Sequence, residues 1–257
     1  MAFGICNLSI VPVRAEASDK SEMVTQLLFG ESFEITQKRS NWLHIRCDYD
    51  QYKGWIDHKQ YLPLSDEAHA ALLSEQSAVV SDLLMIAEPE DPMQAVTVML
   101  GSSLPQFKDG FFQLGEQQLE FSGNIAEASE SREMLMQYAL MYLNTPYLWG
   151  GRSPFGIDCS GFVQVVFKLM GKALPRDARD QALLGETLSF IEECLPGDLA
   201  FFDNDEGAIV HVGIIMPDHQ IIHASGKVRM DKIDQQGIFN TETGKHTHKL
   251  RVLRRNF

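Results

Sequence analysis

The sequence predicts an α+β domain preceded by one or two small β-barrels. Residues 1–64 consist of short alternating runs separated by turn residues, and helical spacing begins at Ser129. The last third of the chain returns to apolar, strand-like runs. Helices followed by antiparallel strands are typical of the α+β class, in which the two kinds of element are segregated along the chain.

Composition excludes several classes of partner. The 257 residues suffice for one large domain or two to three small ones, with 44% hydrophobic and 22% charged residues, as in soluble globular proteins. No apolar run approaches the ~20 residues that cross a bilayer. A net charge of −13 opposes a nucleic-acid or anionic-membrane partner, because both need a basic patch.

The N-terminus indicates a first strand rather than a signal peptide. Its apolar stretch has no basic residue before it, and Asn7 and Pro12 interrupt it. We therefore expect a cytoplasmic protein. A periplasmic or secreted protein whose signal has been removed is the alternative.

Residues 1–64 resemble a bacterial SH3-like (SH3b) barrel. The resemblance rests on "PVRAEAS", "LLFGESFEI", "NWLHIRC" and "YKGWI", which occur in that order and alternate apolar with polar positions. Residues 65–125 begin with helical spacing in "DEAHAALLSEQSAVV" and continue with strands and turns. Their length fits a second, divergent SH3-like domain, which leaves residues 126–257 as the α+β domain.

The α+β domain begins with two predicted helices. "SESREMLMQYALMYLN" has a capping residue followed by apolar positions at helical spacing. After the loop "NTPYLWGGRSPFGID", the run "CSGFVQVVFKLMGKALP" is apolar throughout and ends at Gly171 and Pro175, which predicts a buried helix. "DLAFFD", "IVHVGIIM", "QIIHAS" and "LRVLRR" are then expected to be strands.

Cys159 stands at the start of the second of these helices. The four cysteines are scattered without a C-x-x-C pair, which argues against a disulfide scaffold or a zinc site. Unpaired N–H groups and the helix dipole stabilise a thiolate at a helix N-terminus, so we expect Cys159 to be a nucleophile with a lowered pKa. A buried structural cysteine is the alternative interpretation.

Two histidines downstream supply what a thiol nucleophile requires. His211 and His223 lie on consecutive predicted strands joined by "PDHQ". A hairpin loop of three or five residues would place both imidazoles on one face, whereas a loop of four would separate them. On one face, the three residues form a nucleophile, a base and an orienting group.

These residues occur within a longer series of motifs. "YLWGGRSPFGIDCSGFVQ", "LPRDARDQ", "PGDLAFF", "HVGIIM" and "IIHAS" resemble those of NlpC-type cysteine peptidases of bacterial cell-wall metabolism. The resemblance implies a papain-like fold with a Cys-His-His triad. It assigns Cys159 as nucleophile, His211 as general base and His223 as the residue that orients His211.

An SH3b region fused to such a domain further resembles γ-D-glutamyl-L-diamino acid endopeptidases of murein-peptide recycling. Those enzymes cut stem peptides whose L-Ala has a free amine. The resemblance implies that the SH3b barrel closes one end of the cleft and contacts this amine, with Glu22 as a fallback for the residue involved. Ala178 stands where the subgroup often has a serine. The implied substrate contacts are Asp158, Ser160, Trp149, Asp177, Tyr147, Glu16 and Tyr52.

Three rival functions remain at this stage. The chain would otherwise be a hydrolase of intact peptidoglycan targeted by SH3b, an amidase or acyltransferase on the same scaffold, or an inactive wall-binding protein. We infer no cofactor, since "GGRSPFG" lacks the Lys-Ser/Thr of a phosphate loop. His246 and His248 have a spacing compatible with a metal, but we expect them on a solvated strand.

Overall fold

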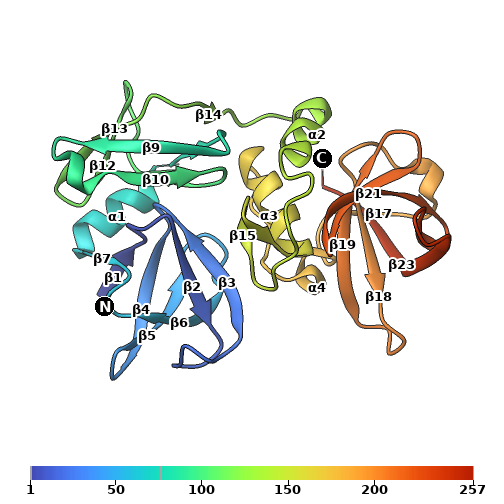
Figure 1. The fold of residues 1–257 in the computed structure, drawn as a ribbon, viewed down its shortest axis with the longest axis horizontal. Coiled ribbons are helices and arrows are strands. Elements are labelled where there is room, and N and C mark those ends of the chain that lie inside the picture. Colours follow the sequence, from blue (N-terminus) through green and yellow to red (C-terminus); the bar gives the residue numbers. More distant parts are fainter. Residues whose placement is uncertain (1, 76, 257) are drawn as a thin grey trace. The chain divides into compact units, whose positions relative to one another are not determined.

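The computed structural model describes residues 2–75 and 77–256, and Figure 1 shows their elements along the chain. The chain divides into two compact units. Unit 1 comprises Met1–Glu127 and Trp149–Pro154, and unit 2 comprises Ala128–Leu148 and Phe155–Phe257. No helix among the described residues has the length and apolarity needed to cross a membrane.

The first part of unit 1 is an antiparallel sheet of seven strands in the order β3-β2-β6-β5-β4-β1-β7. Alternate side chains enter its core, as at Val11 and Val13 in β2, which are fully buried. The short strands predicted for residues 1–64 are therefore confirmed. The strands are β1 (Ala2–Ile5), β2 (Ile10–Arg14), β3 (Met23–Leu28), β4 (Ser32–Arg39), β5 (Trp42–Cys47), β6 (Lys53–Asp57) and β7 (Leu62–Leu64).

The second part of unit 1 starts with helix α1 (Asp66–Ser74), whose N-cap Ser65 accepts a hydrogen bond from the Ala68 N–H. Two small sheets follow, in the orders β10-β9-β13-β12 and β11-β8-β14. Ile5 and Phe29 from the first part pack in one buried cluster with residues of these sheets. The bounds are β8 (Ala78–Val80), β9 (Leu84–Pro89), η1 (Pro92–Gln94), β10 (Val96–Met99), β11 (Ser103–Leu104), β12 (Phe111–Leu114), β13 (Gln117–Glu120) and β14 (Ile125–Ala126).

A buried ion pair fastens the segment Trp149–Pro154 within unit 1. Arg152, in β15 (Arg152–Ser153), forms a bidentate pair with Glu31 at 2.7 and 2.9 Å. The Arg152 N–H also donates to Gln26 Oε1, at 2.8 Å. Gly150 has a φ of +76°, in the left-handed region that favours glycine, and a Cβ there would lie 2.3 Å from the carbonyl oxygen of Met23. This segment is therefore held closely against β3.

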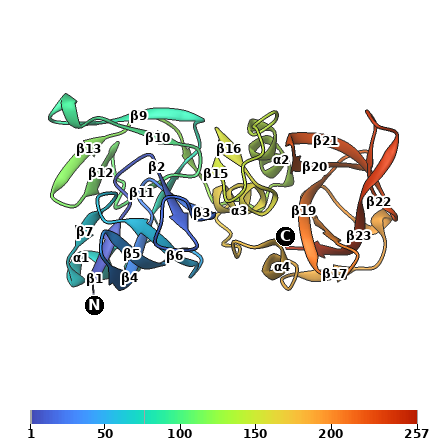
Figure 2. The same ribbon diagram turned by 60° about the horizontal axis from the view of Figure 1, so that its bottom comes forward.

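Unit 2 is built from helices and a seven-stranded antiparallel sheet ordered β17-β23-β18-β19-β20-β21-β22, in which β22 also pairs with β23 (Figures 1 and 2). The strands predicted from "DLAFFD", "IVHVGIIM", "QIIHAS" and "LRVLRR" are all present. The elements are α2 (Arg132–Met141), β16 (Gly156–Ile157), α3 (Cys159–Leu169), α4 (Ala178–Gln181), β17 (Glu186–Leu188), η2 (Ile191–Glu193), β18 (Leu199–Asp203), β19 (Ile209–Met216), β20 (Gln220–Ser225), β21 (Lys227–Asp234), β22 (Gly237–Asn240) and β23 (Lys245–Arg255).

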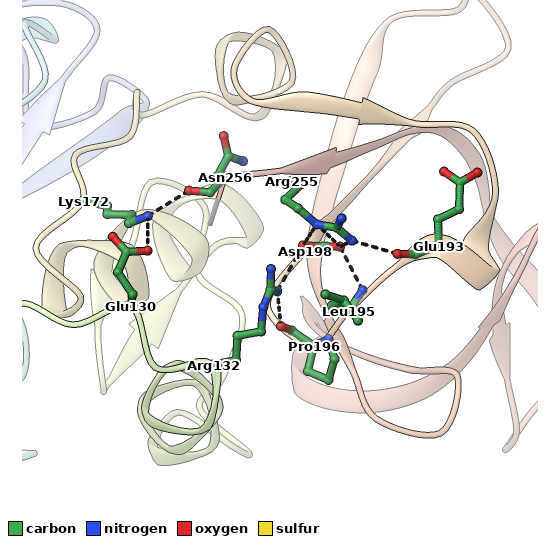
Figure 3. A network of polar contacts seen from close by, with 9 residues as sticks. All are labelled: Glu130, Arg132, Lys172, Glu193, Leu195, Pro196, Asp198, Arg255 and Asn256. Atoms are coloured by element: carbon green, nitrogen blue, oxygen red, sulfur yellow. Dashed lines mark hydrogen bonds and ion pairs between the residues drawn. The ribbon is translucent and has the colours of Figure 1, made fainter.

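Helix α3 is the centre of unit 2, since every one of its residues is buried, as its apolar sequence predicts. A polar network fixes the surrounding elements (Figure 3). The fully buried Asp198 pairs with Arg255 at 2.7 Å, from the end of β23, and with Arg132 at 3.2 Å, from the start of α2. The buried carboxylate, directly before β18, thus joins α2 and β23.

Candidate active site

Cys159 is the first residue of α3. Asp158 caps this helix, because its Oδ1 accepts a hydrogen bond of 2.7 Å from the Gly161 N–H. The thiol is only 7% exposed, and the backbone N–H groups of Val212 and Ser160 interact with its sulfur. The contact with Val212 places the sulfur beside the strand position that follows His211.

Burial nevertheless dominates the protonation of this thiol. Desolvation, with the charge of Asp158, raises the pKa of Cys159 to about 12, although the two backbone N–H groups favour the thiolate. The expectation of a lowered pKa from the helix N-terminus was therefore wrong. In the resting protein Cys159 is a neutral thiol.

The β19–β20 hairpin brings the two histidines together. Met216 pairs with Gln220, so the loop has three residues, and Gly213 pairs with His223. His211 lies two positions from Gly213 and therefore on the face of His223. His211 Nε2 and His223 Nδ1 are 2.8 Å apart. The loop therefore has one of the two lengths, three or five residues, that were expected to place both imidazoles on one face of the sheet.

His211 is surrounded by other rings rather than by solvent. Burial, together with His223 and His248, lowers its pKa well below the usual 6.5. The ring of His248 stacks on it, and Phe202 lies 5.7 Å away between ring centroids. The expectation that His248 lies on a solvated strand was wrong. From its position in β23, its ring packs against that of His211. His246 is exposed, as expected, and bonds to Asp234.

Asp158 and Ser160, expected to contact substrate, are engaged by a residue that the sequence reasoning missed. The buried Arg176 binds the two oxygens of Asp158 at 3.0 and 2.6 Å and donates to Ser160 Oγ at 2.9 Å. Gln181 Nε2 donates to the Ser160 carbonyl. The arginine in "LPRDARDQ" was part of a quoted motif, but no local signal indicates that it enters the core.

Tyr147 and Asp177 also belong to unit 2. Burial raises the pKa of Tyr147 to about 12, with Cys159 and Asp158 adding to the effect, so the phenol stays a hydrogen-bond donor near the thiol. Asp177 occupies the N-cap position of α4 without a side-chain cap bond. Its carboxylate lies 3.3 Å from Arg179.

The remaining expected substrate contacts lie in unit 1. Trp149 is 61% exposed, and its Nε1 donates to Glu22 Oε1 at 2.6 Å. Glu16 is exposed on a turn where Ser21 Oγ accepts from its backbone N–H. Tyr52 packs partly buried against the core of the first sheet. Within this unit, Glu16 is therefore a turn residue and Tyr52 a residue that packs on the core.

Comparison with known families assigns two stretches of the chain. Residues 144–248 match the NlpC/P60 family, and residues 13–60 match the bacterial dipeptidyl-peptidase Sh3 domain. Both stretches coincide with the motifs from which the resemblance was drawn.

Individual relatives extend these matches over most of the chain. A γ-D-glutamyl-L-lysine dipeptidyl-peptidase from Bacillus subtilis is 32% identical over 78% of this chain and 71% of its own length. Dipeptidyl-peptidase 6 from Lysinibacillus sphaericus is 26% identical over 86% and 88%. The crystal structure of an NlpC/P60 family protein from Bacillus cereus superimposes with a TM-score of 0.80 at 19% identity, covering 98% of this chain and 99% of its own.

Proposed function

This chain belongs to the NlpC/P60 family of cysteine peptidases, and we propose that it hydrolyses the γ-D-glutamyl–diamino acid bond of murein stem peptides with a free N-terminal L-Ala. The products would be the dipeptide L-Ala-γ-D-Glu and a fragment that begins with the diamino acid. Such an activity fits peptidoglycan recycling. The names of the two dipeptidyl-peptidases support it, because an enzyme of that class removes two residues from a free amino end.

The hydrogen bond between His211 and His223 carries the assignment of roles. His211 lies on the same strand as Val212, whose N–H interacts with the Cys159 sulfur. Cys159 is the nucleophile, His211 the general base and His223 the group that orients it. A thiol at the start of a buried helix, next to the backbone of the sheet strand that carries His211, also supports a papain-like architecture for unit 2.

The reaction begins from a neutral pair, since burial raises the pKa of Cys159 and lowers that of His211. His211 takes the thiol proton as the sulfur attacks the γ-glutamyl carbonyl carbon. Backbone N–H groups at the start of α3 stabilise the oxyanion. His211 then protonates the departing amine, leaving a thioester, and afterwards takes a proton from the water that hydrolyses it.

The test uses two matched peptides, L-Ala-γ-D-Glu-L-Lys and its N-acetyl form, with products identified by mass spectrometry. We expect release of L-Ala-γ-D-Glu from the free peptide and much slower cleavage of the acetylated one. Cys159→Ala should abolish the reaction, whereas Cys194→Ala should not. Replacing lysine by diaminopimelate measures the preference for the diamino acid.

Intact peptidoglycan provides the contrasting substrate. An enzyme that cleaves intact sacculi or the acetylated peptide as fast as the free peptide would be a wall hydrolase, and the proposed dipeptidyl-peptidase activity would be wrong. No cleavage of any of these substrates by the folded wild-type protein would contradict the peptidase assignment as a whole.

A further inference from the structure

Asp231 ends a line of hydrogen bonds that starts at His211 and crosses three neighbouring strands. In β20 and β21, His223 pairs with Arg229 and Ile221 pairs with Asp231. Residues two apart on a strand share a face, so His211, His223 and Asp231 lie on one face of β19, β20 and β21. Each residue is offset diagonally from the preceding one, and none of the motifs quoted from the sequence includes Asp231.

The two hydrogen bonds determine where the imidazole protons lie. His223 Nε2 is 3.1 Å from Asp231 Oδ2, and both side chains are 1% exposed. An ionised carboxylate only accepts hydrogen bonds, so His223 carries its proton on Nε2. A neutral His223 then has a lone pair on Nδ1, which accepts from His211 Nε2–H across 2.8 Å. His211 is left with an unprotonated Nδ1.

Arg229 keeps the carboxylate ionised and offsets its charge. Its Nη2 donates to Asp231 Oδ1 at 3.0 Å, and its Nε lies 2.8 Å from Oδ2. Burial alone would raise the pKa of Asp231, but hydrogen bonds from His223 and Arg229 outweigh it and lower that pKa.

The neutralisation of the Asp231 charge by Arg229 affects which tautomers His211 and His223 adopt. An imidazolium at His223 would donate from both nitrogens, and His211 would have to accept through Nε2. The proton of His211 would then occupy Nδ1, and the ring would have no lone pair for the thiol. The Arg229 guanidinium already balances the charge of the Asp231 carboxylate, so the two rings need not supply a counter-charge.

We propose that Asp231 is a positioning residue of the catalytic site, which acts through His223 to hold His211 in the tautomer whose Nδ1 receives the Cys159 proton. The inference rests on the proposed function, in which His211 is the base. Asp231 touches neither the thiol nor, given its burial, the substrate, so its contribution is to the tautomer and orientation of the two rings.

The test is the protonation of the two rings, measured from imidazole ¹⁵N chemical shifts in histidine-labelled protein and assigned with His211→Gln and His223→Gln. In the wild type we expect both rings to carry their proton on Nε2. In Asp231→Asn the amide oxygen satisfies Arg229, so the amide NH₂ turns to His223. Its Nε2 then accepts, and both rings shift toward the Nδ1–H form.

Activity gives the second readout. We expect kcat of Asp231→Asn to fall about 10- to 100-fold with little change in KM, less than the ~10⁴-fold loss when a carboxylate bonded directly to a catalytic histidine is replaced. Asp234→Asn is the matched control, because Asp234 lies on the same strand and bonds to the exposed His246. Its tautomers and kcat should equal those of the wild type.

Two results would overturn the inference: a wild-type proton on Nδ1 of either ring, or unchanged tautomers and kcat in folded Asp231→Asn. The wild-type spectrum decides even where the variant does not fold. The proposed function can fail separately. A wild-type protein whose two rings carry their protons on Nε2, but which cleaves no murein peptide, would have the hydrogen-bonded line from His211 to Asp231 and lack the proposed activity.

Discussion

The imidazole of His248 stacks on that of His211, with ring centroids 4.3 Å apart and planes inclined by 28°. Burial, with the influence of His223, lowers the pKa of His248 to about 4, and His211 is lowered as well. Two neutral rings can therefore share this site at neutral pH, and a charge on His248 would oppose protonation of His211.

The lowered pKa values of His211 and His248 predict how the stability of the folded protein depends on pH. The unfolded chain protonates both histidines near pH 6.5, whereas the folded protein does so only at lower pH, so the unfolded state binds more protons between these values. Stability should therefore fall as pH drops from about 6.5 toward 4. His248→Phe keeps an aromatic ring and should make this loss smaller, measured as urea midpoints at pH 7.5 and 4.5. His58→Gln, at a half-buried histidine of unit 1, is the control because it leaves the stacked His211 and His248 rings untouched.

The neutral thiol predicts an unusual alkylation profile. Because burial raises the pKa of Cys159 to about 12, its reaction with iodoacetamide should be slow at pH 7 and should still accelerate above pH 9. Peptide mapping across the pH range measures this rate at Cys159. A rate that is constant from pH 5 to 8 would indicate a preformed thiolate–imidazolium pair and contradict the neutral resting state.

The two histidines should respond differently to the same substitution. In His223→Gln the amide oxygen can accept from His211 Nε2–H while the amide NH₂ donates to Asp231, so we expect partial activity. His211→Gln removes the base, and kcat should fall by about 10⁴-fold, as when a catalytic triad is disabled. Steady-state kinetics on the free peptide compares them. An equal loss, or a greater loss in His223→Gln, would reverse the assigned roles.

Gly213 permits the contact between the histidines. It pairs with His223, and a Cβ at this position would lie 2.9 Å from the Cβ of His223 and 2.7 Å from a methyl carbon of Ile221. Gly213→Ala should separate the rings and lower kcat by about 10-fold or more, since small displacements of catalytic groups are costly. Gly207→Ala is the control for folding, at a glycine with open space around it, though its φ of +79° adds backbone strain. Wild-type kcat in Gly213→Ala would show that the strand adapts.

The buried pair in unit 1 makes a prediction about stability. The Arg152 and Glu31 side chains are 3% and 4% exposed, so Glu31→Gln leaves a buried guanidinium without its counter-charge and should cost about 3–5 kcal/mol. Glu34→Gln disrupts a pair with Arg46, whose side chain is 44% exposed, and should cost about 0–1 kcal/mol. Urea unfolding measures both. Equal costs would mean that burial adds nothing to the Arg152 pair.

Local patterns in the sequence were sufficient for much of the fold. The apolar run after Cys159 identified a buried helix, because a helix that is apolar on all sides needs protein around it. Period-two alternation identified the short strands of residues 1–64, and short apolar runs identified the main strands of unit 2. Cys159, His211 and His223 were singled out because a thiol lies at a predicted helix start and histidines lie on consecutive predicted strands, and the resemblance to NlpC-type peptidases supplied their roles.

Tertiary structure decided the protonation states and the partners of these residues. The helix N-terminus suggested a lowered pKa for Cys159, but burial of the thiol in the folded protein raises that pKa instead. Asp231 joins His223 only through the register of β20 and β21, and His248 reaches His211 only because β23 folds back beside β18. The sequence by itself determined which groups are present and on which elements they lie. Burial and strand register, which depend on long-range packing, determined what those groups contact and where their protons lie.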